Sequence, residues 1–210
     1  MKSRILPIIV AALALTACGS QKQTQLFNGK DFEGWVPVVD QKDTTGVNPF
    51  SVKDGCIAIA GQPYGYLRTE KVYGDYKAHL EFRWTDENGS NSGFFQRVQN
   101  DDTVWPHGIE CQLCHGSLGE FVALSGAKIE GVTPEESGFG FKHRPENIAD
   151  PENPIGEWNS IDVEVKGGHV KYSVNGKLIN ECDTDLTSGY IAVQSEGGPL
   201  EVRNIWIEEK

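Results

Sequence analysis

The sequence predicts an all-β fold in which two antiparallel sheets pack as a sandwich. Apolar and polar residues alternate along 76–84, 161–166 and 170–174, as they do in strands with one buried face. No long stretch has the 3.6-residue periodicity of an amphipathic helix. Short strands at this spacing, separated by turn residues, are typical of a two-sheet sandwich.

Two dipeptides mark tight turns between predicted strands. Asn175-Gly176 follows the last alternating segment, and Asp54-Gly55 separates two short apolar runs. Both dipeptides favour the left-handed backbone conformation that two-residue hairpin turns require. Residues 131–157 contain four prolines and predict a long loop, and long loops in compact domains are often functional.

The N-terminus has the organisation of a bacterial export signal. A short basic start precedes an apolar run at 5–14, which is too short to span a bilayer as a helix. The next four residues, Leu-Thr-Ala-Cys, resemble a lipobox, in which the cysteine, here Cys18, is lipidated after cleavage. The expected divisions are a signal peptide (1–17), a lipidated tether (18–25) and a single β-sandwich domain (26–210).

The acidic charge limits the possible partners. The chain has 19 Lys and Arg against 30 Asp and Glu, a formal net charge of −11, and cleavage of the signal removes Lys2 and Arg4. This charge disfavours nucleic acid and anionic membrane surfaces, but places no limit on neutral sugars. We expect an exported protein attached to the bacterial cell envelope, at its periplasmic face or at the cell surface, only through the lipid on Cys18.

The stretch 111–115, CQLCH, matches the C-x-x-C-H pattern of covalent haem attachment. Its surroundings predict a strand, on which Cys111 and Cys114 point to opposite faces with Cα atoms about 10 Å apart. A disulfide needs a Cα–Cα distance of roughly 4.4–6.8 Å, so these two cysteines cannot pair on a regular strand. The same geometry is unfavourable for binding a shared zinc ion or for attaching haem. We expect no haem and interpret both cysteines as reduced, while pairing with Cys56 or Cys182 stays open.

The same strand has a polar face. Glu110, Gln112 and Cys114 share it, whereas Cys111 lies on the other face. A carboxylate is costly to bury without a partner, so this face is either open to solvent or part of a site. We favour a site, because a half-buried sandwich strand with Glu and Gln on one face is not plain core.

Several short motifs occur in one order along the chain. They are LFNGKDFEGW (26–35), NSGFFQR (91–97), GIECQ (108–112), GEWN (156–159), VNG (174–176), VQ (193–194) and VRNI (202–205). In this order they resemble the 3-keto-disaccharide hydrolase domain family. The resemblance implies a concanavalin A-like lectin/glucanase sandwich, a jelly roll, whose concave sheet acts on glycosides oxidised at C3. It also implies that Arg97, Glu110, Gln112 and Gln194 lie at the site.

Two positions depart from the pattern of the family. Many relatives have Asp five residues after Glu110, where this chain has His115, and many have His where this chain has Glu196. We infer that acid and imidazole have exchanged places and that His115 and Glu196 face each other; the alternative is two independent surface residues. Trp105 is a candidate stacking platform for a sugar ring, or alternatively an anchor of its loop.

A retaining glycosidase needs two carboxyl groups about 5–5.5 Å apart, and the strand 108–112 supplies only one, which argues against ordinary glycosidase chemistry. The 3-keto substrate that the resemblance implies allows elimination instead. A C3 ketone acidifies the C2 hydrogen, so a base removes it and the C1 oxygen leaves. Glu110 or His115 is the expected base, and Glu196 either orients His115 or protonates the leaving oxygen. Arg97 or a divalent cation would stabilise the enolate.

Two functions therefore follow from the sequence. The first is a lipoprotein enzyme that cleaves 3-keto-glycosides, as a lyase or with net hydrolysis. The second is a non-catalytic carbohydrate-binding module that uses the same face to hold a small glycoside. The sequence identifies no ligands for a metal, so the identity of any bound cation stays open.

Overall fold

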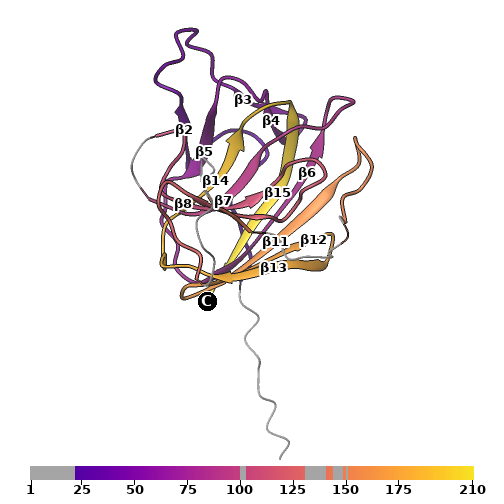
Figure 1. Cartoon of the computed structure of the whole chain (residues 1–210). Helices are drawn as coiled ribbons and strands as arrows, with labels where there is room; N and C mark the ends of the chain where they lie inside the picture. The colour runs from indigo at the N-terminus through magenta and orange to yellow at the C-terminus, as the bar shows by residue number, and fades with distance from the viewer. Residues whose placement is uncertain (1–21, 100–102, 131–140, 144–148, 150) are drawn as a thin grey trace, which may run out of the picture.

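The computed structural model describes residues 22–99, 103–130, 141–143, 149 and 151–210. These residues contain fifteen strands and no helix, which confirms the all-β prediction. The strands form two antiparallel sheets that pack face to face (Figure 1). The expected signal peptide, the lipidated Cys18 and most of the central part of the proline-rich loop lie outside the described residues.

The two sheets are named sheet A and sheet B. Sheet A has the order β13 (Lys177–Asp183), β12 (His169–Val174), β11 (Asn159–Lys166), β6 (Tyr76–Trp84), β15 (Leu200–Glu209), β4 (Cys56–Ile59) and β3 (Phe50–Lys53), and β1 (Thr24–Gln25) also pairs with β15. Sheet B has the order β10 (Phe141–His143), β9 (Phe121–Leu124), β8 (Gly108–Gln112), β7 (Gly93–Val98), β14 (Tyr190–Ser195), β5 (Gly65–Thr69) and β2 (Trp35–Val39).

Both predicted hairpins are present in sheet A. Asn175 and Gly176 join β12 to β13 with φ angles of 49° and 75°, and Asp54 and Gly55 join β3 to β4 with φ angles of 51° and 77°. Two successive residues with positive φ turn the chain in the sense that matches the twist of the flanking strands. The local turn chemistry thus fixes the register of these strand pairs.

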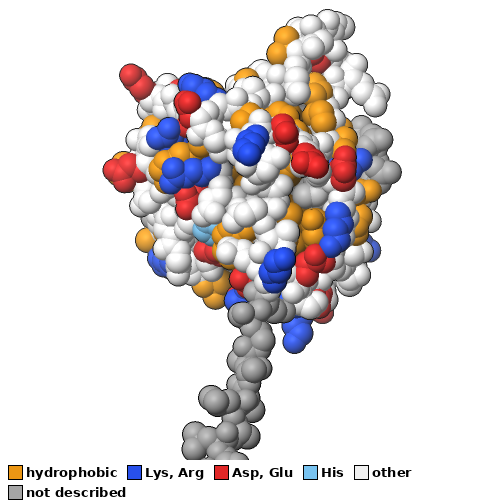
Figure 2. Space-filling model, turned by 180° about the vertical axis from the view of Figure 1, so that it is seen from behind, with side chains coloured by type: hydrophobic (Ala, Val, Ile, Leu, Met, Phe, Trp, Pro, Cys, Tyr) orange, Lys and Arg blue, Asp and Glu red, His pale blue; other side chains and the backbone are white. Residues whose placement is uncertain are grey.

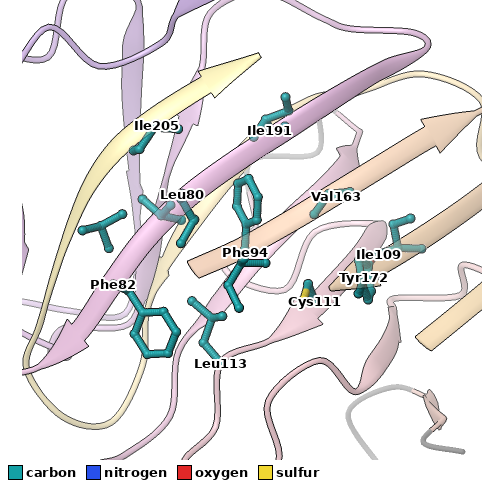
Figure 3. Close-up of a cluster of buried hydrophobic side chains, with 14 of the residues drawn as sticks. Leu80, Phe82, Phe94, Ile109, Cys111, Leu113, Val163, Tyr172, Ile191 and Ile205 are labelled. Carbon is teal, nitrogen blue, oxygen red and sulfur yellow. The ribbon is translucent and has the colours of Figure 1, made fainter. Parts of the chain in front are cut away.

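The main hydrophobic core lies between the sheets. Residues of β6 and β11 are buried alternately, as the sequence predicts. Figure 3 shows Leu80 and Phe82 of sheet A together with Phe94 and Ile109 of sheet B in this core. Removal of this apolar surface from water is the dominant force that holds the sheets together.

Sheet B is also buried on its second face. Every residue of β7 and β8 is buried, instead of every second one. On the face turned away from sheet A, Tyr66, Phe95 and Val122 belong to a smaller apolar cluster. An antiparallel sheet usually leaves one face to solvent, so this outer face of sheet B departs from a plain sandwich.

Charged groups of both signs are interspersed over the face of the molecule that Figure 2 shows. The formal net charge of −11 is therefore not gathered into one acidic patch on that face. None of the described segments is a helix with the length and apolar character needed to cross a membrane.

Candidate active site

Three polar side chains lie on the central strands of sheet B, on its outer face. Glu110 and Gln112 belong to β8 and Gln194 belongs to β14, with β7 between these two strands. Their neighbours Ile109 and Cys111 point the other way, into the core between the sheets. The structure thus brings together three residues that the sequence predicts at the site.

A glycine makes room for the carboxyl group of Glu110. Gly93 of β7 pairs with Gln112, and Phe95 pairs with Glu110. A Cβ atom on Gly93 would lie 2.9 Å from Cδ of Glu110, which is closer than Cβ atoms approach other atoms in real proteins. The Glu110 side chain therefore reaches from β8 across the backbone of β7.

These side chains are almost completely buried, although they lie on an outer face. The exposed fraction is 3% for Glu110, 3% for Gln112 and 1% for Gln194. The Oε1 atoms of both glutamines, and Oδ1 of Asn91 just before β7, have no hydrogen-bond partner among the described residues. A buried polar group without a partner costs about 1–3 kcal/mol. A ligand that supplies hydrogen-bond donors would remove this cost.

Aromatic rings extend this face. Tyr64, which sequence reasoning missed, has its ring centroid 6.1 Å from that of Trp105. The hydroxyl groups of Thr103 and Ser125 both donate to the Trp105 carbonyl oxygen. Trp105 is therefore anchored through its backbone, while its half-buried ring contacts Tyr64, so both predicted roles are compatible with its position.

A family model described as the 3-keto-alpha-glucoside-1,2-lyase-like domain matches residues 22–208. The chain belongs to this family. A curated 3-keto-disaccharide hydrolase of Bacteroides thetaiotaomicron is 24% identical over 228 residues, which cover 87% of this chain and 77% of that protein. The resemblance predicted from the motifs is thereby confirmed, and the family indicates a protein that acts on glycosides.

Two solved structures are similar to this chain. A Parabacteroides distasonis protein described as a candidate glycosyl hydrolase has a TM-score of 0.65 and 27% identity, covering 90% of this chain and 94% of that chain. A Bacillus licheniformis β-glucanase has a TM-score of 0.58 and 15% identity, covering 92% and 99%. The second likeness concerns the fold alone and confirms the predicted concanavalin A-like sandwich.

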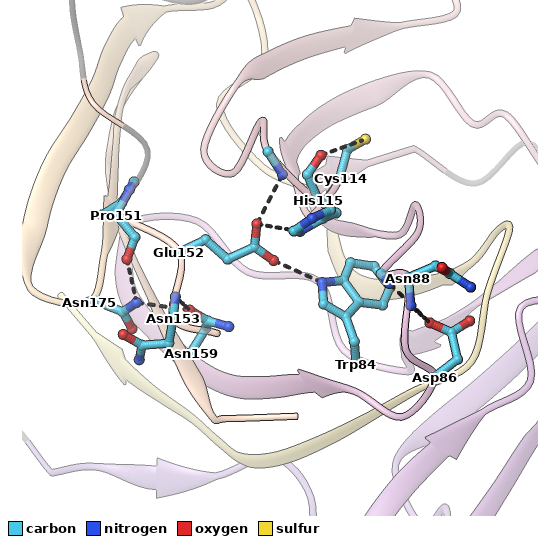
Figure 4. Close-up of polar contacts among 12 residues, drawn as sticks. Trp84, Asp86, Asn88, Cys114, His115, Pro151, Glu152, Asn153, Asn159 and Asn175 are labelled. Atoms are coloured by element: carbon cyan, nitrogen blue, oxygen red, sulfur yellow. Dashed lines mark hydrogen bonds and ion pairs between the residues drawn. The ribbon is translucent and has the colours of Figure 1, made fainter. Parts of the chain in front are cut away.

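Two motif asparagines of the lyase-like family hold the loop before β11. The side-chain oxygen of Asn159 accepts hydrogen bonds from the Asn153 backbone and the Asn175 amide, each 2.8 Å long. Asn175 also donates to the Pro151 carbonyl at 2.9 Å. These contacts fix the chain on both sides of Glu152 (Figure 4). The GEWN and VNG motifs are therefore partly explained by loop positioning.

His115 contacts Glu152, not Glu196 as expected from the sequence. Nδ1 of His115 lies 2.8 Å from Oε2 of Glu152, which also accepts a 2.9 Å hydrogen bond from the Gly116 N–H (Figure 4). The indole N–H of Trp84 donates to the other carboxylate oxygen at 2.9 Å. His115 thus lies beside sheet A at the end of the sandwich, and the expected His115–Glu196 pair is corrected to a His115–Glu152 pair.

Glu196 lies directly after β14. It forms an isolated backbone bridge with Asn91. Because Glu196 follows Gln194 by two residues, alternation places it on the outer face. Of the three predicted catalytic residues, Glu110 and Glu196 therefore share the outer face of sheet B, whereas His115 does not.

Replacing Glu152 by alanine is expected to lower the free energy of unfolding by about 2–3 kcal/mol, because the buried Trp84 N–H loses its acceptor. Urea denaturation would measure the change. Glu157→Ala, an exposed glutamate of the same segment, is the matched control and should change stability little. Equal effects of the two substitutions would contradict a structural role for Glu152.

Arg97 lies away from the face where the resemblance places it. Its φ of 60° falls at a register shift between β7 and β14, a bulge that redirects the side chain. The guanidinium is completely buried, donates to the carbonyls of Thr187 and Gly167, and lies 3.9 Å from Asp75. Arg97 therefore ties loops together, and its position does not fit enolate stabilisation.

Of the CQLCH cysteines, Cys111 lies on β8, whereas Cys114 follows the end of this strand by two residues. Cys111 is buried in the core, where burial raises the pKa of its thiol well above the ordinary value. The Cys114 thiol donates to the His115 carbonyl at 3.8 Å. Neither forms a disulfide among the described residues, and nor do Cys56 and Cys182. The described part of the chain contains no group of three or more His, Cys, Asp or Glu side chains that could hold a metal ion.

Proposed function

We propose that this protein is an enzyme that cleaves glycosides whose sugar ring is oxidised at C3, on the outer face of sheet B. The observation that carries the proposal is the burial of the Gln112 and Gln194 side-chain amides beside Glu110. The oxygen atoms of these two amides have no hydrogen-bond partner among the described residues. Hydroxyl groups of a sugar ring supply the missing donors. The family supports the 3-keto class of substrate.

Glu110 is the general base in this proposal. Its carboxylate takes the C2 proton, and the C–H electrons form an enolate whose negative charge rests on the C3 oxygen. The enolate then re-forms the ketone as the C1–O bond breaks, leaving a 3-keto-2-hydroxyglycal and an alkoxide that takes a proton. Addition of water to this product gives net hydrolysis.

The glutamines replace Arg97 as partners of the C3 oxygen. Each amide offers two N–H donors besides its oxygen, so Gln112 and Gln194 can bind ring hydroxyls and the developing oxyanion together. Their burial favours this role, because donors fixed in a water-poor site stabilise charge without reorganising. Glu196, two residues after Gln194, is the candidate acid for the leaving oxygen.

The test uses the chain without residues 1–18 and a 3-keto-glucoside with a chromophoric leaving group, with the unoxidised glucoside as control. We expect release from the keto form only. Activity lost on EDTA treatment would add a divalent cation to the mechanism. Binding of both sugars without release from either would contradict the enzyme and favour a carbohydrate-binding module.

The chain is also proposed to be lipid-anchored through Cys18. In a bacterial host, Cys18→Ser is expected to abolish incorporation of labelled palmitate and to release the protein from the membrane fraction. Cys114→Ser is the matched control and should keep the label. Label retained in the Cys18→Ser protein would contradict the anchor.

A further inference from the structure

A hollow of about 370 Å³ lies between two loops that connect the sheets. Its walls are Asp43, Thr45 and Val47 of the β2–β3 loop and Gln62 and Pro63 of the β4–β5 loop. Each loop joins a strand of sheet A to a strand of sheet B. The β2–β3 loop projects from the body of the molecule at the top of Figure 1.

Hydrogen bonds at both ends hold the two loops together. The Asp40 N–H donates to the Tyr64 carbonyl, and the Ala60 N–H donates to the Pro49 carbonyl, both at 2.9 Å. Within the β2–β3 loop, the Thr45 hydroxyl donates to the Asp43 carboxylate at 2.6 Å. The hollow therefore has walls that are formed before a ligand arrives, as small-molecule sites usually have.

The hollow adjoins the end of β14 that carries Gln194. The Ser195 hydroxyl, one residue after Gln194, donates to the carbonyl of Pro63 in the wall at 3.1 Å. Tyr66 pairs with Gln194, and Tyr64, directly before β5, precedes Tyr66 by two residues, so alternation places it on the same face about 7 Å further along the chain. Tyr64, whose ring contacts Trp105, is also the next residue after Pro63 in the wall of the hollow.

We propose that this hollow is a second sugar subsite, which holds the leaving-group ring of a disaccharide. The inference rests on the proposed function, because the oxidised ring must lie over Glu110 and the glutamines. Val47 and Pro63 present apolar surface to the C–H groups of a pyranose. The Asp43 carboxylate and the Gln62 amide accept from its hydroxyls. A carboxylate in the wall disfavours acidic sugars, so the ring in this subsite is a neutral one.

Val47→Arg tests the subsite, because the long side chain fills the hollow. Val47 is 53% exposed, and Val72→Arg is the matched control on the β5–β6 loop, where the valine is 45% exposed. For a 3-keto-disaccharide we expect Val47→Arg to lower kcat/KM by about 10- to 100-fold, mainly through KM. For a 3-keto methyl glucoside, which has no second ring, the kcat/KM of Val47→Arg should equal that of the unchanged protein.

Two kinetic outcomes would overturn the subsite: an equal loss on both substrates, or no loss on either. If the unchanged protein cleaved no keto substrate, the proposed function would be refuted. A binding measurement would then test the subsite independently of catalysis. A methyl NMR titration with an unoxidised neutral disaccharide should then shift Val47 and Thr45, and Val47→Arg should abolish binding. Unshifted methyl signals at millimolar sugar would refute the subsite.

Discussion

Glu110→Gln is expected to lower kcat for a 3-keto-glycoside by about 100- to 10,000-fold, the usual contribution of a general base. The amide has nearly the shape of the carboxyl group and fits over Gly93, so folding should be preserved. It cannot take the C2 proton, because an amide has no basic oxygen at neutral pH. Chromophore release measures kcat, and calorimetry with the unreactive glucoside measures binding.

The matched control for this substitution is Glu70→Gln, at an exposed glutamate directly after β5. It should leave kcat and KM unchanged. If Glu110→Gln altered only the affinity and left release intact, Glu110 would be a binding group. The base would then have to be sought at Glu196, which shares the outer face.

The parts of the fold that the sequence predicts are those with a local cause. Alternation in 76–84 and 161–166 depends only on which face each residue presents, and the hairpin dipeptides act over two residues. The same local rule places Glu110 and Gln112 together on one face of β8. Gln194 follows only from the motif order, because its proximity to β8 depends on strand pairing across the sheet.

The parts of the site that the sequence misses have long-range causes. The resemblance places Arg97 at the site, but a bulge changes which side of the strand a residue presents without leaving a clear mark in the sequence. Glu152, shortly before β11 of sheet A, contacts His115, which follows β8 of sheet B. Tyr64 and Trp105 meet through two loops far apart along the chain. No periodicity encodes such meetings.

Gly93→Ala is expected to lower kcat by about 100-fold, although Gly93 has no side chain to take part in chemistry. The new methyl group would lie 2.9 Å from Cδ of Glu110 and 2.6 Å from Cε1 of Phe95, so both side chains must move. A displacement of about 1 Å at a reacting group can cost this much. Overpacking should also lower the free energy of unfolding by about 1–3 kcal/mol, which thermal denaturation would measure.

Gly74→Ala is the matched control, because a Cβ atom there meets nothing within 4 Å and its φ is not positive. It should leave kcat unchanged. The decisive comparison is the double variant Gly93→Ala with Glu110→Gln. If Gly93 acts by giving Glu110 its place, the double variant should be no slower than Glu110→Gln alone, because residues that act as one unit are not additive. Additive losses would mean that Gly93→Ala disturbs the glutamines or the strand itself, independently of the base.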